Sequence, residues 1–117
     1  MDVETVIPTQ CHLWSKEPLT KSDLRFRMIE TYSEENHFEQ KLLECADCGQ
    51  VFYSQFYEEI DWEDGNDSQY STFIPIQPSK ETIERLNKSS PIELLQFIPR
   101  LHYDSKTETT IKWARQT

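Results

Sequence analysis

The chain has 117 residues, of which 36% are hydrophobic and 28% charged, and its formal net charge is −9. This length and composition predict one folded domain over residues 1–117 and argue against a disordered chain. The sequence has neither a run of about 18 apolar residues nor a basic stripe, so we expect no transmembrane helix, no binding to membrane surfaces and no binding to nucleic acid.

The chain begins with a segment, residues 1–20, that we expect to be irregular because prolines and scattered polar residues interrupt it. Apolar and charged residues then alternate, which predicts a half-buried strand over residues 24–32. Its buried face is expected to carry Leu24, Phe26 and Met28.

The next residues predict a hairpin and a second turn. A polar turn is expected over residues 31–36, and the chain then returns as a strand over residues 38–44. A tight turn follows over residues 45–49, where Gly49 can adopt the positive φ that such turns often need.

The segment 51–62 fits two structures. Phe52, Phe56 and Ile60 have helical spacing, yet they also share one face of a strand, and the density of Val, Phe and Tyr favours the strand. A hairpin connection over residues 64–67 is expected to lead into the next strand.

That next strand is predicted over residues 70–76. Pro75 and Pro78 close it, and proline cannot donate to a sheet ladder, so we expect this strand at an edge or a rim. The last two strands are predicted over residues 101–103 and 111–113, around a polar turn over 104–107.

Two short helices are expected between those strands. Ser79 is a candidate N-cap for a helix at about 80–88. Ser90, Pro91 and Glu93 provide an N-cap, a proline at the first helical position and a capping-box glutamate for a helix over 91–97. The class predicted is α+β, with a mainly antiparallel sheet and the two helices on a face.

The stretch from Leu42 to Phe52 contains the chain's one Cys-x-x-Cys pair, Cys45 and Cys48, followed by Gly49. It resembles the zinc knuckle of zinc-ribbon proteins, in which two thiolates on a tight turn bind one metal ion. The resemblance covers about eleven residues and provides half of a site. It implies a structural zinc ion with tetrahedral ligands.

The other ligands must come from elsewhere in the chain. Cys11 and His12 precede the first predicted strand, near the end of the sheet where Cys45 emerges, so we predict Cys11, Cys45 and Cys48 with His12 or His102 as fourth ligand. His37 lies at the far end of the predicted first hairpin, roughly 20 Å away, which disfavours it. Three cysteines also form an odd count, which favours reduced thiols in a cytoplasmic protein over a disulfide scaffold.

Acidic residues are concentrated between Glu30 and Asp67. This segment holds twelve of the 21 acidic residues in the chain and one basic residue, Lys41. The same segment holds half of the fourteen aromatic residues. Carboxylates steer basic proteins and aromatic rings anchor them, so we expect a basic protein as partner. The residues predicted to bind it are Tyr57, Glu58, Glu59, Asp61, Trp62, Glu63 and Asp64.

In size and charge the chain resembles immunity proteins, which neutralise a basic toxin by covering its active site. The resemblance implies a non-catalytic, inhibitor-type function. The alternative is a small zinc enzyme or a redox enzyme that uses the Cys-x-x-Cys pair, and neither the oligomeric state nor the identity of the partner follows from the sequence.

Overall fold

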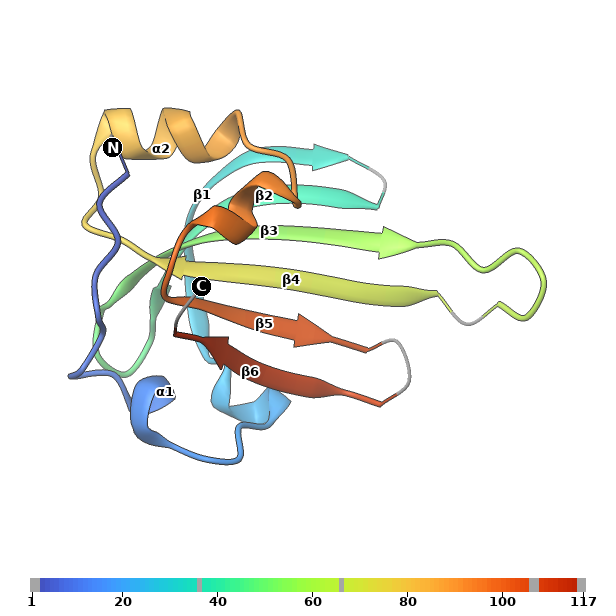
Figure 1. The fold of residues 1–117 in the computed structure, drawn as a ribbon, viewed down its shortest axis with the longest axis horizontal. Coiled ribbons are helices and arrows are strands. Elements are labelled where there is room, and N and C mark those ends of the chain that lie inside the picture. Colours follow the sequence, from blue (N-terminus) through green and yellow to red (C-terminus); the bar gives the residue numbers. More distant parts are fainter. Residues whose placement is uncertain (1–2, 36, 66, 106–107, 116–117) are drawn as a thin grey trace.

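The computed structural model describes residues 3–35, 37–65, 67–105 and 108–115. They form a six-stranded antiparallel sheet with the strands in chain order, together with short helices, which is the predicted α+β fold (Figure 1). The strands are β1 (Phe26–Glu35), β2 (Phe38–Cys45), β3 (Val51–Glu59), β4 (Ser68–Pro75), β5 (Arg100–Asp104) and β6 (Thr110–Ala114). The α-helices are α1 (His12–Ser15) and α2 (Lys80–Asn87), and η1 (Lys21–Asp23) and η2 (Glu93–Gln96) are 3₁₀ turns.

Each face of the sheet carries a hydrophobic cluster, because successive side chains along a strand point to opposite faces. Tyr53 points to one face, where it packs in a cluster with Leu86 of α2 and Leu94 of η2. Phe52 points to the other face and packs with Leu13 of α1. The segment 1–20, expected to be irregular, contains α1 as its one helical element among the described residues.

The capping hydrogen bonds predicted from the sequence are confirmed, but Ile92 is the N-cap of η2, so Pro91 precedes the first helical position. The Ser79 hydroxyl accepts a hydrogen bond from the Thr82 amide, which caps α2. Ser90 and Glu93 exchange the two hydrogen bonds of a capping box, at 2.9 and 3.2 Å. The second helix is shorter than the predicted 91–97, because only residues 93–96 form a 3₁₀ turn.

The prediction for the first strand is wrong in two respects. Residues 31–35, predicted as a turn, belong to β1, and Asn36 lies outside the described residues. Met28, predicted to be buried, is 59% exposed although it keeps the register of Phe26, because β1 is an edge strand with a neighbour on one side only. Register shifts follow between Met28 and Glu30 and again between Thr31 and Ser33. An edge strand tolerates such bulges because it has a partner on one side only.

The segment 51–62 is a strand as far as Glu59, so Trp62 lies beyond it. The expected edge position of the next strand is wrong, because β4 pairs with both β3 and β5. Pro75 is tolerated there because the pairing with β5 ends at Phe73, two residues earlier. In the turns expected at 64–67 and 104–107, Asn66, Lys106 and Thr107 lie outside the described residues.

Within the described part of the chain, no helix has the length and apolar character needed to cross a bilayer.

Leu86 offers a test of the packing between α2 and the sheet. Its side chain has no exposed surface, so Leu86→Ala is expected to cost about 2–5 kcal/mol of the free energy of unfolding. Leu95→Ala is the matched control, because Leu95 is half exposed and should cost under about 1.5 kcal/mol. Urea denaturation followed by circular dichroism measures both, and equal losses would contradict this packing.

Candidate functional site

The three cysteines converge at one end of the sheet, although Cys11 is far from the other two in sequence. Cys11 lies at the N-cap of α1, Cys45 is the last residue of β2 and Cys48 lies in the β2–β3 turn. Their sulfur atoms all lie within 4.8 Å of one another. Cys11 and Cys45 are buried and Cys48 is exposed.

The β2–β3 turn is shaped by local hydrogen bonds. The Gly49 amide donates to the Cys45 carbonyl at 2.8 Å, and the Cys45 amide donates to the Gln50 carbonyl at the same distance. Gly49 has φ of +81°, as its place in the turn predicts. A Cβ atom there would meet nothing within 4 Å, so the backbone conformation alone requires glycine.

The cysteine cluster can hold a metal ion such as zinc. Zinc–sulfur bonds of about 2.3 Å in tetrahedral geometry place two sulfur atoms roughly 3.8 Å apart. The observed upper limit of 4.8 Å is within about 1 Å of that spacing. Burial raises the pKa of the Cys11 thiol to about 12, so Cys11 stays protonated without a cation and is a poor redox nucleophile.

The three histidines lie in different places. A ring nitrogen of His12 lies within 4.8 Å of the Cys45 sulfur and of an Asp47 oxygen, in a second group that could hold a metal. His37 has its Nδ1 atom 2.9 Å from Glu58 Oε1, at the opposite end of the sheet. His102 lies on β5 and accepts a hydrogen bond from Arg100 at 2.7 Å. Of the three histidines, therefore, only His12 lies beside the cysteine cluster.

Asp23 holds the segment after α1 in place. Its carboxylate accepts hydrogen bonds from Lys16 Nζ at 2.6 Å and from the Thr20 amide at 2.8 Å. The hydrogen bond from Lys16, followed by that from Thr20, lowers the pKa of Asp23 from 3.8 to about 2. The Asp23 backbone carbonyl contacts His12 Nε2 at 3.1 Å, so the same residue positions His12.

This carboxylate predicts an acid dependence of stability. Because the pKa is lower in the folded state, the stabilisation is present above about pH 4 and is lost as the pH falls toward 2. The variant Asp23→Asn should be less stable than the wild type at pH 7, and the difference should shrink as the pH approaches 2. Urea midpoints at pH 7 and pH 2.5 measure this, and a difference independent of pH would contradict it.

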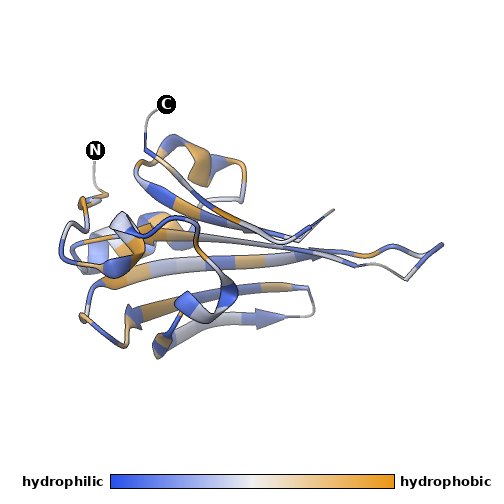
Figure 2. Cartoon of the chain, turned by 90° about the horizontal axis from the view of Figure 1, so that it is seen from below, coloured by the Kyte–Doolittle hydropathy of each residue, from blue (hydrophilic) through white to orange (hydrophobic). Residues whose placement is uncertain are grey.

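The connection between β3 and β4 forms a projecting loop, whose described residues, 59–65 and 67, we call the acidic finger. It extends past the ends of the other hairpins in two perpendicular views (Figures 1 and 2). Trp62 on this finger is 90% exposed, and Glu59, Glu63 and Asp64 are also exposed.

The finger is stabilised by its own hydrogen bonds. Asp61 Oδ1 accepts from the amides of Glu63 and Asp64 at 3.1 and 3.0 Å, and Asp67 Oδ1 accepts from the Asp61 amide at 2.9 Å. Gly65, at φ of +71°, donates its amide to the Asp61 carbonyl. Asp61 therefore shapes the loop that presents Trp62.

Two of the residues predicted to bind a partner, Tyr57 and Glu58, make side-chain contacts within the sheet. Tyr57 stacks on Tyr70 with ring centroids 4.8 Å apart. Hydrogen bonds from His37 and then from Gln69 lower the pKa of Glu58. The side chains of Glu59, Trp62, Glu63 and Asp64 are exposed.

The fold brings one further acidic residue, Asp104, to the same end of the sheet as the finger. The β1–β2, β3–β4 and β5–β6 hairpins all turn at that end (Figure 1). Asp104 therefore lies at the end that carries the finger, although it is 37 residues from Asp67 in sequence. The alternation of turns in a simple meander is the signal that could have found it.

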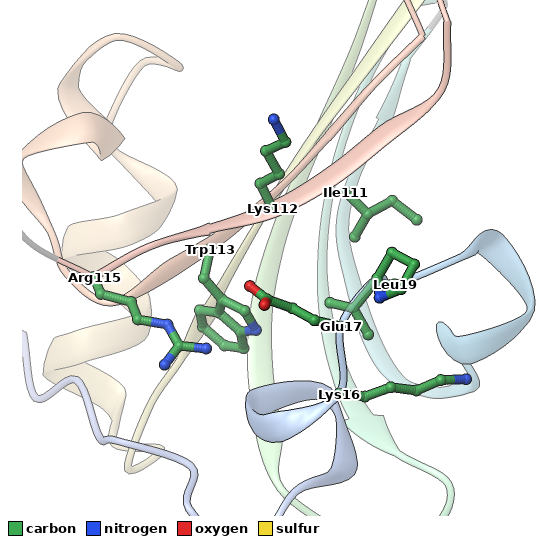
Figure 3. Close-up of a pocket in the computed structure, with 8 residues that line it drawn as sticks. Lys16, Glu17, Leu19, Ile111, Lys112, Trp113 and Arg115 are labelled. Atoms are coloured by element: carbon green, nitrogen blue, oxygen red, sulfur yellow. The ribbon is translucent and has the colours of Figure 1, made fainter.

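A cavity of about 560 Å³ lies between the loop after α1 and the edge strand β6. Figure 3 shows Glu17 extending toward Trp113 and Lys112 pointing away. Lys16 is bound to Asp23, and Arg115 lies over the Trp14 ring at 4.0 Å. The other lining residues are Pro18, Leu19 and Ile111.

Comparison of the chain with protein-family models, with curated proteins and with solved structures finds no match. The resemblance to zinc-ribbon proteins rests on the residues around Cys45 and Cys48, and the resemblance to immunity proteins rests on size and charge.

Proposed function

We propose that this protein is a non-catalytic binding protein of the inhibitor type, and that it engages a basic protein through the acidic finger. The observation that carries the proposal is Trp62, whose side chain is 90% exposed between acidic neighbours on a projecting loop. Tryptophan is the residue type most enriched among binding hot spots, because a partner can bury its large rigid surface.

Charge supports a basic partner. Glu59, Glu63 and Asp64 surround Trp62 on the finger, and Asp104 lies at the same end of the sheet. Carboxylates gathered at one end of a molecule accelerate encounter with a cationic surface and can pair with arginine at the rim of the interface. The hydrogen bonds of Asp61 support this role, because they organise the finger in the unbound protein and reduce the entropy lost on binding.

We further propose that Cys11, Cys45 and Cys48 hold a structural zinc ion. The finger and the cysteine cluster lie at opposite ends of β3, about 25 Å apart along the strand, so the metal is placed to stabilise the fold and not to contact the partner. Burial of Cys11 and Cys45 favours this role over a redox enzyme, which needs accessible thiolates.

The test begins with affinity capture. The immobilised protein is exposed to lysate from its own organism and eluted with a salt ramp, beside a matched column that carries Trp62→Ala. A basic protein retained by the wild type and lost from the variant column supports the proposal. Retention that is equal on both columns, or bound proteins that are not basic, would count against it.

Charge reversal on the finger tests the steering role. The double variant Glu63→Lys, Asp64→Lys should lower the association rate constant by about 10-fold at low salt and weaken its dependence on ionic strength. These positions are preferable to Glu59 and Asp61, because the Asp61 carboxylate shapes the loop itself. Surface plasmon resonance against the captured partner at several salt concentrations measures the effect. An unchanged association rate would remove the finger from the encounter surface.

A further inference from the structure

We propose that His12 completes a four-coordinate zinc centre with Cys11, Cys45 and Cys48, and that it binds the metal through Nδ1. This inference rests on the proposal that the cysteines hold zinc. It adds the identity of the fourth ligand, the atom that binds and the residue that orients it.

Position is the first argument. Cys45 belongs to both groups of potential ligands, one with Cys11 and Cys48 and the other with His12 and Asp47. His12 follows Cys11 directly, and neighbouring residues on a strand would point in opposite directions. Here the backbone changes from extended at Cys11 (φ −91°, ψ 134°) to helical at His12, so both side chains reach the surroundings of Cys45.

The orientation of the imidazole ring is the second argument. His12 Nε2 lies 3.1 Å from the backbone carbonyl oxygen of Asp23. A carbonyl oxygen only accepts hydrogen bonds, so Nε2 carries the proton and the neutral ring has its lone pair on Nδ1. Zinc-binding histidines usually donate their second N–H to a carbonyl or a carboxylate in this way, which fixes the tautomer and the ring orientation.

The surroundings of Nδ1 are the third argument. Nδ1 lies 3.7 Å from Asp47 Oδ2, so a cation bound to Nδ1 would also be attracted by this carboxylate. Asp47 is the weaker candidate for fourth ligand, because Arg25 Nη2 already donates to its Oδ2 atom at 2.7 Å.

Net charge agrees with this choice. Three thiolates and a neutral histidine around Zn²⁺ leave one negative charge, whereas a carboxylate in place of the histidine would leave two. The Asp47–Arg25 pair, being neutral overall, can then lie beside the centre without adding to its charge. The inferred centre therefore links the segment before β1 to the β2–β3 turn through two ligands from each.

The test uses the zinc-loaded full-length protein. Zinc K-edge X-ray absorption should show three sulfur atoms and one nitrogen, with the outer-shell scattering of an imidazole ring. ¹⁵N NMR should show His12 as the Nε2–H tautomer with a metal-bound Nδ1. In His12→Ala the imidazole scattering should disappear and zinc affinity should fall by about 100-fold or more, whereas Asp47→Asn should keep the imidazole scattering.

The outcomes separate this inference from the one on which it rests. One zinc per chain without imidazole scattering, or a His12 ring protonated on both nitrogens in the zinc-loaded protein, would overturn the role of His12 and leave the cysteine site standing. If the wild type takes up no zinc in equilibrium dialysis, both proposals fall. Persistent imidazole scattering in His12→Ala would also overturn the inference, because another histidine would then be the ligand.

Discussion

Removal of zinc by a chelator is expected to lower the thermal unfolding midpoint of this protein by roughly 15 °C. At a free zinc concentration about 1,000 times the dissociation constant, binding to the folded state alone contributes about 4 kcal/mol. For a domain of this size, each kcal/mol corresponds to about 4 °C. The expected effect is large because the proposed zinc ion would tie the N-terminal segment, through Cys11, to Cys45 at the end of β2 and to Cys48 in the β2–β3 turn.

Cys48→Ser is the variant that isolates the metal. Cys48 is exposed, so a serine hydroxyl there is hydrated, whereas Cys45→Ser would also bury a hydroxyl and add its own cost. Differential scanning calorimetry should give Cys48→Ser the midpoint of the chelated wild type, with no further change on adding chelator. A wild-type midpoint that the chelator does not move would contradict structural zinc.

The same variants separate the binding protein from the enzyme alternative. In a small zinc or Cys-x-x-Cys redox enzyme, loss of one thiol should abolish an activity and leave the melting curve almost unchanged. If the metal is structural, loss of one thiol should instead lower the thermal unfolding midpoint. The melting curve of Cys48→Ser therefore discriminates between the two before any substrate is known.

Trp62→Ala is expected to weaken binding of the basic partner by at least about 30-fold, which corresponds to roughly 2 kcal/mol. The loss arises because the partner buries the indole ring, and the small side chain of alanine cannot replace that contact. The unfolding midpoint should not change, since the Trp62 side chain is 90% exposed in the free protein. Titration calorimetry with the captured partner measures the affinity.

Ile7→Ala is the matched control for this variant. Ile7 is a large apolar residue that is also mostly exposed, and it precedes α1, at the end of the sheet away from the finger (Figure 1). Its substitution should leave the affinity unchanged. If Trp62→Ala binds as tightly as the wild type, Trp62 does not anchor the partner, whatever the effect of charge reversal at Glu63 and Asp64.

Errors of the sequence analysis have local physical causes. Alternation predicted a buried Met28, but Met28 lies on the edge strand β1, where no second neighbouring strand covers its side chain. Pro75 suggested an edge strand, but β4 continues past the last residue that pairs with β5, and that extension accommodates the proline. Side-chain alternation and the position of a proline both depend on where the neighbouring strands begin and end, which the sequence of one strand does not contain.

The sequence by itself determined features that depend on neighbours along the chain. The caps at Ser79 and Ser90 and the turn at Gly49 are set by hydrogen bonds within a few residues, and the structure has all three. The Cys45–Cys48 spacing and the acidic segment were visible for the same reason. Short turns also favour pairing of strands that follow one another, whereas the pairing of β4 with β5 spans the segment 76–99, which contains α2 and η2.

Only the tertiary structure decided which distant residues meet. It brought Cys11 to Cys45 and His12 beside them, while His37 and His102 lie elsewhere. It also gave Asp61 a structural role within the finger and left Trp62 exposed. Contacts of this kind depend on strand register, on the path of the N-terminal segment and on the packing of both faces of the sheet. Those are set by the folding of the whole chain, so no local pattern records them.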